Sequence, residues 1–447
     1  MFCKSVSSTA PRQARYITSR VFSTTPRQVV VVDGVRTPFK KSSGEYDDFK
    51  PYDLGRRVIK AIMDRNTLNP EDVDYVTFGT VIQEVKTHNL ARECALGAGL
   101  PNTIPAHTVS MACISSSQAI TSGAEKILSG KADVILAGGA ESFSDVPIKY
   151  GPKLRKRLIQ APKAMKKGPA GALGLLKGLG AKDFAPEPPA ISNFITGEVM
   201  GHSADRLAAK FGVTREEQDE FAMASHHNAA NAHEKGFLEN QLIRVTKSMS
   251  DDGVRGGSQI DDYKKMKPAF VKPHGTITAA NASFLTDGAS CSLIMSSTKA
   301  NELGLNPLSV LKDWNYVAVD PFDELLLAPA FCVAKILKDN NLTVADIDVW
   351  EIHEAFAGQV LANLKALESE EFCKDRFGWD AAVGTIPRDK LNQWGGSLSI
   401  GHPFGATGSR LVTTTSERLK AEGGRYGICT ACADSGLGSG MLIEIAK

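Results

Sequence analysis

Long hydrophobic runs are missing from this chain of 447 residues, and so is a strong net charge of either sign. A helix that spans a bilayer needs about 20 consecutive apolar residues, and no run approaches that length. The formal net charge of +2 gives no reason to expect nucleic acid as a partner. Eight cysteines in so long a chain do not form a disulfide framework. They indicate a reducing compartment, where a thiol stays available for chemistry.

Acidic residues are absent from the first 32 positions. Basic residues are scattered there among serines and threonines, namely Lys4, Arg12, Arg15, Arg20 and Arg27. This composition predicts a mitochondrial transit peptide over residues 1–27, and a disordered basic tail is the alternative. The remaining chain is long enough for two or three domains.

Two stretches of the chain share one order of predicted elements. In the first, a buried strand (29–32) ends at the turn Asp33-Gly34, and a later strand (106–110) precedes a helix. In the second, an acidic lead-in and strand (343–350) precede a glycine-rich segment, a helix and a strand (426–432). The predicted apolar helix faces are Ile120, Ala124, Ile127 and Leu128, and Leu411, Val412, Thr415 and Leu419. This repetition indicates a duplication with a parallel-rich sheet in each half, against chance similarity of two ordinary βαβ units.

The segment between the halves changes in composition. Residues 146–182 contain no Asp or Glu, and basic residues alternate there with apolar ones. A solvated loop is the plain interpretation, and contact with coenzyme phosphates is another. The alternation favours a helix lying on an anionic membrane surface, where each Lys or Arg contributes about 1 kcal/mol.

Three short segments carry reactive side chains. They are MACISSS (111–117), GHPFGATG (401–408) and CTACADSG (429–436). A nucleophilic thiol, a histidine that takes its proton and a second thiol that moves a proton form a complete set for acyl transfer. Cys113 is placed at the start of a predicted helix, where amides and a nearby imidazole favour the thiolate. The segments together predict that Cys113, His402 and Cys432 act at one site.

No metal site is predicted. His226, His227 and His233 lie on a predicted helix (216–235) without a matching cluster of ligands. Cys429 and Cys432 have the spacing of a redox or zinc pair, but no second pair accompanies them. An acid/base role for Cys432 explains more of the pattern.

These segments resemble the thiolase family from about Val29 to the C-terminus. Other matching segments follow in family order, namely 32–39, 138–142, 200–201, 216–219, 275–283 and 287–289. The resemblance implies an α/β fold with the duplicated αβαβα layers of thiolases and an inserted loop domain over the active site. The expected boundaries are 28–148 with 269–302 for the N-terminal half, 149–268 for the loop domain, and 303–447 for the C-terminal half.

The resemblance also implies the chemistry. Cys113 attacks the 3-oxo carbonyl of a 3-ketoacyl-CoA and holds the shortened acyl group, while His402 activates it and helps stabilise the thioester oxygen. Cys432 protonates the departing acetyl-CoA carbanion. Ser283 and Met200 match positions near the pantetheine arm of coenzyme A, which is the cosubstrate. No bound cofactor is expected.

Two positions depart from the common family pattern. His353 stands where many thiolases have an asparagine that positions a water in the oxyanion hole, and a histidine can donate a hydrogen bond instead. Asp434 stands where glycine is common. Its backbone amide can still serve the oxyanion hole, but its carboxylate can oppose a developing negative charge.

The histidine variant and the basic insert resemble the branch of the family that acts on long-chain substrates in fatty acid β-oxidation. In that branch the thiolase is a β subunit with a hydratase–dehydrogenase α subunit. We therefore expect a homodimer core with that partner, on the matrix side of the mitochondrial inner membrane. Lys149–Lys182 is the expected membrane contact.

Alternatives remain open at this level. A short-chain acetoacetyl-CoA thiolase has the same motifs, although His353 and the basic insert argue against it. A condensing ketoacyl synthase would need a second histidine in place of Cys432. A scaffold that binds acyl-CoA without turnover has Asp434 as its only support.

Overall fold

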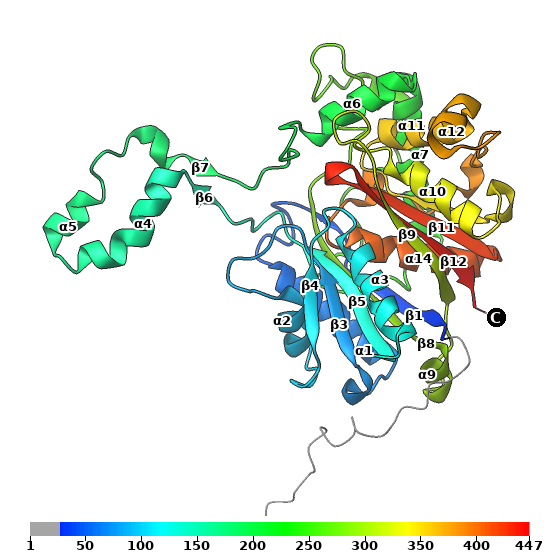
Figure 1. Cartoon of the computed structure of the whole chain (residues 1–447), viewed down its shortest axis with the longest axis horizontal. Helices are drawn as coiled ribbons and strands as arrows, with labels where there is room; N and C mark the ends of the chain where they lie inside the picture. Colours follow the sequence, from blue (N-terminus) through cyan, green and yellow to red (C-terminus); the bar gives the residue numbers. More distant parts are fainter. Residues whose placement is uncertain (1–26, 447) are drawn as a thin grey trace, which may run out of the picture.

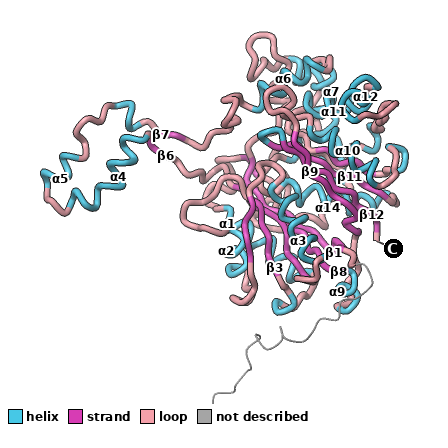
Figure 2. The backbone as a smooth tube through the Cα atoms, viewed as in Figure 1, coloured by secondary structure: helices cyan, strands magenta, loops and turns pink. Residues whose placement is uncertain are grey.

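One mixed sheet runs through the computed structural model, which describes residues 27–446. The transit peptide predicted for residues 1–27 lies outside the described residues except for Arg27. The strand order is β10-β11-β12-β9-β1-β8-β5-β3-β4, with the short β2 paired to β8. Figure 2 shows the strands in magenta running through the body, with helices in cyan around them. The strands are β1 (Val29–Arg36), β2 (Lys40–Lys41), β3 (Tyr75–Gly79), β4 (Ala106–Val109), β5 (Val134–Glu141), β8 (Thr286–Ser296), β9 (Ser309–Ala318), β10 (Val349–Ile352), β11 (Tyr426–Ala433) and β12 (Leu437–Ile445).

The two ends of this sheet repeat one pairing pattern. In the first half β3 is parallel to β5, and β8 is antiparallel to both β5 and β1. In the second half β10 is parallel to β11, and β12 is antiparallel to both β11 and β9. The halves join where β1 pairs with β9. The predicted duplication is therefore visible strand by strand, although each half is mixed rather than mainly parallel.

Helices form three layers around the two halves of the sheet. The helices α1 (Pro51–Arg65) and α2 (Leu90–Gly97) pack on the first half, and α10 (Ala328–Asp339) with α11 (Ala357–Glu368) packs on the second. Between the halves lie α3 (Ser115–Leu128) and α14 (Thr407–Glu422), whose apolar side chains share one buried cluster with both parts of the sheet. The result is the expected αβαβα arrangement.

The remaining helices of the body are shorter or lie at its edges. They are α6 (Met200–Lys210), α7 (Arg215–Glu234), α8 (Ile260–Lys264), α9 (Ser297–Glu302), α12 (Glu370–Phe377) and α13 (Ser397–Ile400). Helix α7 begins where the sequence specifies it, because the Thr214 hydroxyl accepts from the Glu217 amide at 3.2 Å. The Glu217 carboxylate accepts in return from the Thr214 amide at 2.6 Å, which completes a capping box. Within residues 27–446, no helix combines the length and apolar character needed to cross a membrane.

Two local predictions are wrong. The chain does not turn at Asp33-Gly34, because β1 continues to Arg36 with a register shift after Val31. Asp33 is held by an ion pair with Arg65, so a polar residue is accommodated within the strand. Leu128, the last residue of α3, is 44% exposed and does not belong to the buried face of the helix.

Residues 149–187, called the arm here, stand away from the body (Figure 1). A hairpin of β6 (Lys149–Tyr150) and β7 (Pro186–Glu187) forms its base, and α4 (Pro152–Met165) and α5 (Pro169–Gly174) form its outer part. The expectation that the whole insert covers the active site is therefore wrong for the arm. Most of its side chains, apolar ones included, are exposed because the arm makes little contact with the body. The three-part division of the chain itself stays a prediction.

Candidate active site

Cys113 lies in the tight connection between β4 and α3. Ala112 before it has a φ of 46°, a left-handed conformation that is unfavourable for residues other than glycine. Ser115 holds this shape, because its hydroxyl donates to the Ala112 carbonyl at 2.6 Å and accepts from the Met111 amide at 2.8 Å. The side chain of Cys113 is thereby fixed where the strand ends and the helix begins.

The thiol of Cys113 is not a preformed thiolate. Burial raises its pKa well above the ordinary value, and the neighbouring Cys432, Asp434 and Glu141 raise it further. We expected the helix amides and an imidazole to favour the thiolate, and this expectation is wrong for the resting protein. The proton therefore has to leave Cys113 as the nucleophile attacks, which requires a base beside it.

His402 is held in the connection between α13 and α14. Gly401 before it has a φ of 103°, and a β-carbon there would lie 2.7 Å from the Thr286 hydroxyl. That hydroxyl accepts a hydrogen bond from the His402 amide at 3.0 Å. Nδ1 of the ring lies 2.7 Å from the Thr407 hydroxyl. Burial, then His353 and Arg410, hold the pKa of His402 well below 6.5, so the ring is neutral.

His353 follows directly after β10. Its amide donates to the Thr430 carbonyl at 2.9 Å, which continues the pairing with β11. Nδ1 lies 3.0 Å from the Ser397 hydroxyl. Burial lowers the pKa of His353 to about 3, and the Arg410 charge contributes to this shift. This imidazole is also neutral at physiological pH.

The structure brings Cys113, His353 and His402 together. The Cys113 sulfur and a ring nitrogen of each histidine lie within 4.8 Å of one another, and the two ring centroids are 4.1 Å apart. Among the described residues, neither histidine Nε2 has a hydrogen-bond partner. Two neutral imidazoles beside one thiol supply a proton acceptor and a polar group for a developing oxyanion.

Cys432 lies near the end of β11 and is 1% exposed. It belongs to a different buried cluster from Cys429, because alternate residues of a strand face opposite sides of the sheet. The redox or zinc pairing of these two cysteines is therefore excluded by the fold. Burial raises the pKa of Cys432 to about 12, so it holds its proton at neutral pH. Ionisation of Cys432 would raise the pKa of the Cys113 thiol further.

Asp434 stands in the turn after β11, and its carboxylate is held by one side chain of another segment and by the next backbone amide. Its Oδ1 accepts from the Asn193 amide group at 2.8 Å and from the Ser435 amide at 2.7 Å. The carboxylate that was expected to oppose an oxyanion is thus occupied by two donors. Its contribution to the raised pKa of Cys113 nevertheless shows that its charge is felt at the nucleophile.

Ser283 is connected to the segment after His353, and Met200 to the apolar cluster that contains Cys432. The Ser283 amide donates to the Ala355 carbonyl at 2.9 Å, two residues after His353. Met200 begins α6 and packs against the same apolar cluster as Cys432 and Ala355. Their roles stay a prediction.

Two open hollows flank the segment before Ser283. One has a volume of about 410 Å³ and includes His202, Arg206 and His274. The other has a volume of about 310 Å³ and includes Arg255 and Ser258. Arg206 in the first hollow is paired with Glu198 of the same lining, whereas Arg255 in the second offers a positive group suited to a phosphate-bearing molecule.

Glu141 ties the nucleophile half to the histidine loop. This buried carboxylate accepts from the amides of Val81, Ile82 and Gly405, each at 3.0 Å. Burial raises its pKa to about 7.

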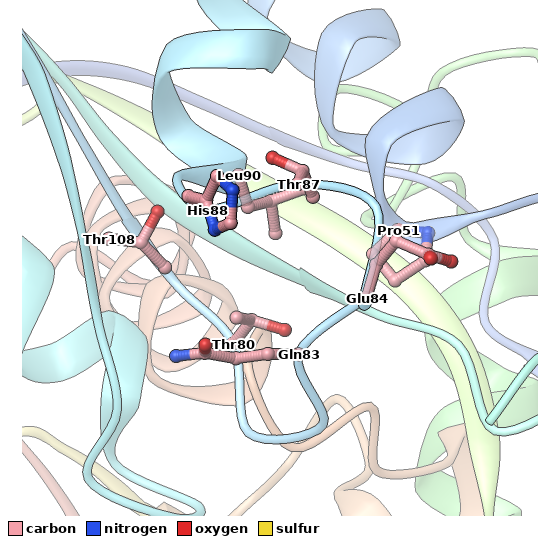
Figure 3. Close-up of a pocket in the computed structure, with 8 residues that line it drawn as sticks. All are labelled: Pro51, Thr80, Gln83, Glu84, Thr87, His88, Leu90 and Thr108. Carbon is pink, nitrogen blue, oxygen red and sulfur yellow. The ribbon is translucent and has the colours of Figure 1, made fainter. Parts of the chain in front are cut away.

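A small cavity beside the segment that contains Val81 and Ile82, drawn in Figure 3, has a volume of only about 10 Å³. It holds at most one water and is not a substrate site.

The three histidines of α7 do not join the site and have hydrogen-bond partners of their own. His226, His227 and His233 have separate partners, respectively the Arg255 amide, the Ser258 carbonyl and the Asp251 carboxylate. That no metal is bound stays a prediction.

The sequence analysis missed three residues around the two central histidines, His353 and His402. Ser397 and Thr407 contact these histidines directly, and Arg410 contacts His353 through the Ser397 hydroxyl. Arg410 could have been noticed as a charged residue within a helix whose neighbours are largely apolar or small.

Comparison with known proteins agrees with this geometry. Sequence models described as "Thiolase, N-terminal domain" and "Thiolase, C-terminal domain" match residues 29–298 and 305–445. The mitochondrial trifunctional enzyme subunit beta of Bos taurus is 51% identical over 94% of this chain and 88% of that protein. A probable 3-ketoacyl-CoA thiolase of Caenorhabditis elegans is 50% identical over 93% of this chain and 94% of that protein. The crystal structure of human mitochondrial 3-ketoacyl-CoA thiolase in complex with CoA matches with a TM-score of 0.80 and 28% identity, over 94% of this chain and 98% of that chain.

Proposed function

The chain belongs to the thiolase family, and from this premise we propose that it cleaves 3-ketoacyl-CoA with free coenzyme A. The products are acetyl-CoA and a shortened acyl-CoA, so the enzyme is an acetyl-CoA C-acyltransferase. The observation that carries this proposal is the meeting of the Cys113 thiol with ring nitrogens of His353 and His402 within 4.8 Å. Coenzyme A is a cosubstrate in this reaction.

The first half of the reaction forms an acyl-enzyme. His402 takes the proton of Cys113 as the sulfur attacks the 3-oxo carbon. The bond between the second and third carbons then breaks, and its electron pair passes to the acetyl-CoA part as a carbanion. Cys432 donates its proton to that carbanion, because a thiol with a pKa of about 12 is loaded with a proton at neutral pH. Acetyl-CoA leaves, and the shortened acyl group remains on Cys113.

The second half transfers the acyl group to free coenzyme A. The incoming thiol gives its proton to the Cys432 thiolate and attacks the thioester carbon. Cys113 leaves as a thiolate and recovers its proton from His402, so all three groups return to their starting states. His353 and His402 face the carbonyl oxygen in both halves. One hydrogen-bond donor to such an oxygen contributes about 3 kcal/mol.

The coenzyme passes Ser283 and Met200 in this proposal. Met200 packs against the apolar cluster that contains Cys432, and Ser283 directly follows Ala282 of that cluster. The hollow with Arg255 and Ser258 is also lined by Ala280 of the same segment. The pantetheine arm is largely uncharged and suits the first environment. The phosphates suit the second, because an arginine can contact them directly.

The preferred substrates are long-chain 3-ketoacyl-CoA esters of mitochondrial fatty acid β-oxidation. Support comes from His353 and the basic arm, and from 51% identity to a protein named as the beta subunit of a mitochondrial trifunctional enzyme. The test is acetyl-CoA formation from a series of 3-ketoacyl-CoA lengths, with Cys113→Ala as the control. Rising kcat/KM from short to long chains is expected. Turnover of acetoacetyl-CoA alone would make this a short-chain thiolase.

The assembly proposed here is a homodimer core with a hydratase–dehydrogenase α subunit. Strand β4 stands at the end of the sheet order, and its four residues are all partly exposed. An edge strand of this kind can pair with a second copy of the chain. The α subunit is proposed because the bovine relative is itself named as a beta subunit.

The arm is proposed to lie on the matrix face of the inner membrane. Ten basic residues lie between Lys149 and Lys182, and large apolar side chains beside them are exposed, including Ile159 at 75% and Leu173 at 69%. Cations attract anionic lipid while apolar side chains enter the headgroup region. Attraction of this kind weakens as salt is added.

Vesicle binding tests the arm. Replacing Lys156 and Lys163 by Glu should lower affinity for anionic vesicles by at least about 2 kcal/mol, or roughly 30-fold. The matched control replaces Lys131 and Lys420, which are exposed on the body, by Glu. Equal loss in both variants, or binding to neutral vesicles of the same strength, would contradict a role for the arm.

A further inference from the structure

The two central histidines have hydrogen-bond partners that place their ring protons differently. For His402 the partner is the Thr407 hydroxyl, 2.7 Å from Nδ1. That hydroxyl has one proton, which it donates to the Pro403 carbonyl at 3.1 Å, and a carbonyl can only accept. Thr407 therefore accepts from His402, so Nδ1 carries the proton. The unpartnered Nε2 of His402 is left with a lone pair and acts as a base.

For His353 the order of donation is reversed. The partner of its Nδ1 is the Ser397 hydroxyl at 3.0 Å. Ser397 also receives a hydrogen bond from the Arg410 guanidinium at 3.2 Å, and a guanidinium can only donate. The Ser397 proton is thus free to go to His353 Nδ1. The ring proton of His353 then stands on Nε2, which has no other partner within the described residues.

Arg410, which donates to Ser397, is itself buried and held by an ion pair. It is 1% exposed, and its guanidinium lies 3.3 Å from the Glu351 carboxylate. Glu351 also pairs with Arg418 at 2.8 Å, and it lies on β10 two residues before His353. A guanidinium remains charged in proteins, so its direction of donation does not change with pH. The same charge opposes protonation of His353.

We propose that Arg410 and Ser397 are positioning residues that fix His353 as an N–H donor toward the substrate oxygen. This inference rests on the proposed thiolase reaction and deepens it. With the opposite tautomer, His353 would turn a lone pair toward the oxygen and toward the lone pair of His402, and no ring N–H would face the site. In the fixed arrangement one ring accepts the proton of Cys113 while the other already donates. After that proton transfer, both rings donate to the oxygen.

The proton positions can be read directly in the resting protein. Histidine labelled with ¹⁵N gives well-separated signals for protonated and unprotonated ring nitrogens, and the His353 signals are those that vanish in His353→Asn. We expect protonated Nε2 and unprotonated Nδ1 for His353, and the reverse for His402. In Ser397→Ala the His353 preference should be lost. In the matched control Ser399→Ala, a buried serine of the same helix, it should persist. A protonated Nδ1 on His353 in the unchanged protein would overturn the proposal.

The second test of the proposal measures kcat and KM for cleavage of 3-ketoacyl-CoA. Ser397→Ala should lower kcat by at least about 10-fold with KM little changed, up to the 10²- to 10³-fold typical of losing one oxyanion donor. The same change made in His353→Asn should have less than about a twofold effect, because an amide donor needs no tautomer fixed. Equal losses in both backgrounds would show a merely structural serine and overturn the inference. Absence of turnover in the unchanged protein would instead refute the proposed function, and the nitrogen signals would still decide this proposal.

Discussion

The acid dependence of stability should be less steep when His353 is replaced by Asn. Burial lowers the pKa of His353 from 6.5 to about 3 in the folded protein. Above pH 6.5 the ring is neutral in the folded and unfolded states, so it contributes nothing to the pH dependence of the free energy of unfolding. Between pH 6.5 and 3 only the unfolded chain binds the proton, so the free energy of unfolding falls as pH falls. The loss is about 1.4 kcal/mol per pH unit, or roughly 2 kcal/mol between pH 6.5 and 5.

Comparison of the two proteins isolates this contribution. His402 and His226, whose pKa values are also lowered, act in the same direction in both proteins. Glu141, whose raised pKa is about 7, acts in the opposite direction, because its folded form keeps a proton that the unfolded form releases above pH 4.5. The contributions of His226 and Glu141 cancel in the difference between the proteins, and the contribution of His402 changes little because burial is the largest cause of its lowered pKa.

The assay is urea unfolding of the protein and the variant at pH 7, 6 and 5. The gap in unfolding free energy between the two should change by about 2 kcal/mol in favour of the variant from pH 7 to pH 5. Replacement of the exposed His88 by Asn controls for loss of a histidine as such. If the free energy of unfolding had the same pH dependence in the protein and in His353→Asn, the account of a buried, neutral imidazole at this position would be refuted.

Three other outcomes follow from the same geometry. Gly408→Ala should cost about 1–3 kcal/mol in thermal unfolding, because its β-carbon would lie 2.4 Å from a backbone nitrogen of α3; Gly174→Ala, with no atom near the added carbon, should cost none, and equal effects would contradict this. Cys432→Ala should slow cleavage of 3-ketoacyl-CoA by about 10²- to 10⁴-fold, and it should slow the exchange of the acetyl protons of acetyl-CoA with deuterated solvent; undiminished exchange would contradict a carbanion-protonating role. Asp434→Asn should lower the pKa of Cys113 and speed its alkylation by iodoacetamide at pH 8, whereas an unchanged rate would show that the carboxylate does not reach the thiol.

Much of the fold could be predicted from local patterns. Helices α3, α7 and α14 and strands β4 and β11 lie within a few residues of their predicted positions, because apolar periodicity and capping residues are local signals. The end of β1 could not be predicted, because the Asp33-Gly34 pair is typical of turns. Within the strand the Asp33 carboxylate is paired with the distant Arg65 and Asn66, which a local pattern does not contain.

The reactive residues could be predicted, but their electrostatic state could not. The motifs around Cys113 and His402 are recognisable in the sequence, and the structure places both beside His353. The helix position of Cys113 suggested a lowered pKa, whereas burial and neighbouring acidic groups raise it. Ser397 and Arg410 act through partners that are distant in the sequence, so only the folded arrangement shows that they set the state of His353.

The most direct test is the location of the acyl group after reaction with a 3-ketoacyl-CoA in the absence of free coenzyme A. Peptide mass spectrometry should find the shortened acyl chain on Cys113, formed together with acetyl-CoA, and adding coenzyme A should remove it. His402→Asn should slow its formation by about 10²-fold or more, and Cys113→Ala should abolish it. An adduct of undiminished yield on another residue in Cys113→Ala would contradict the assignment of the nucleophile and of the site built around it.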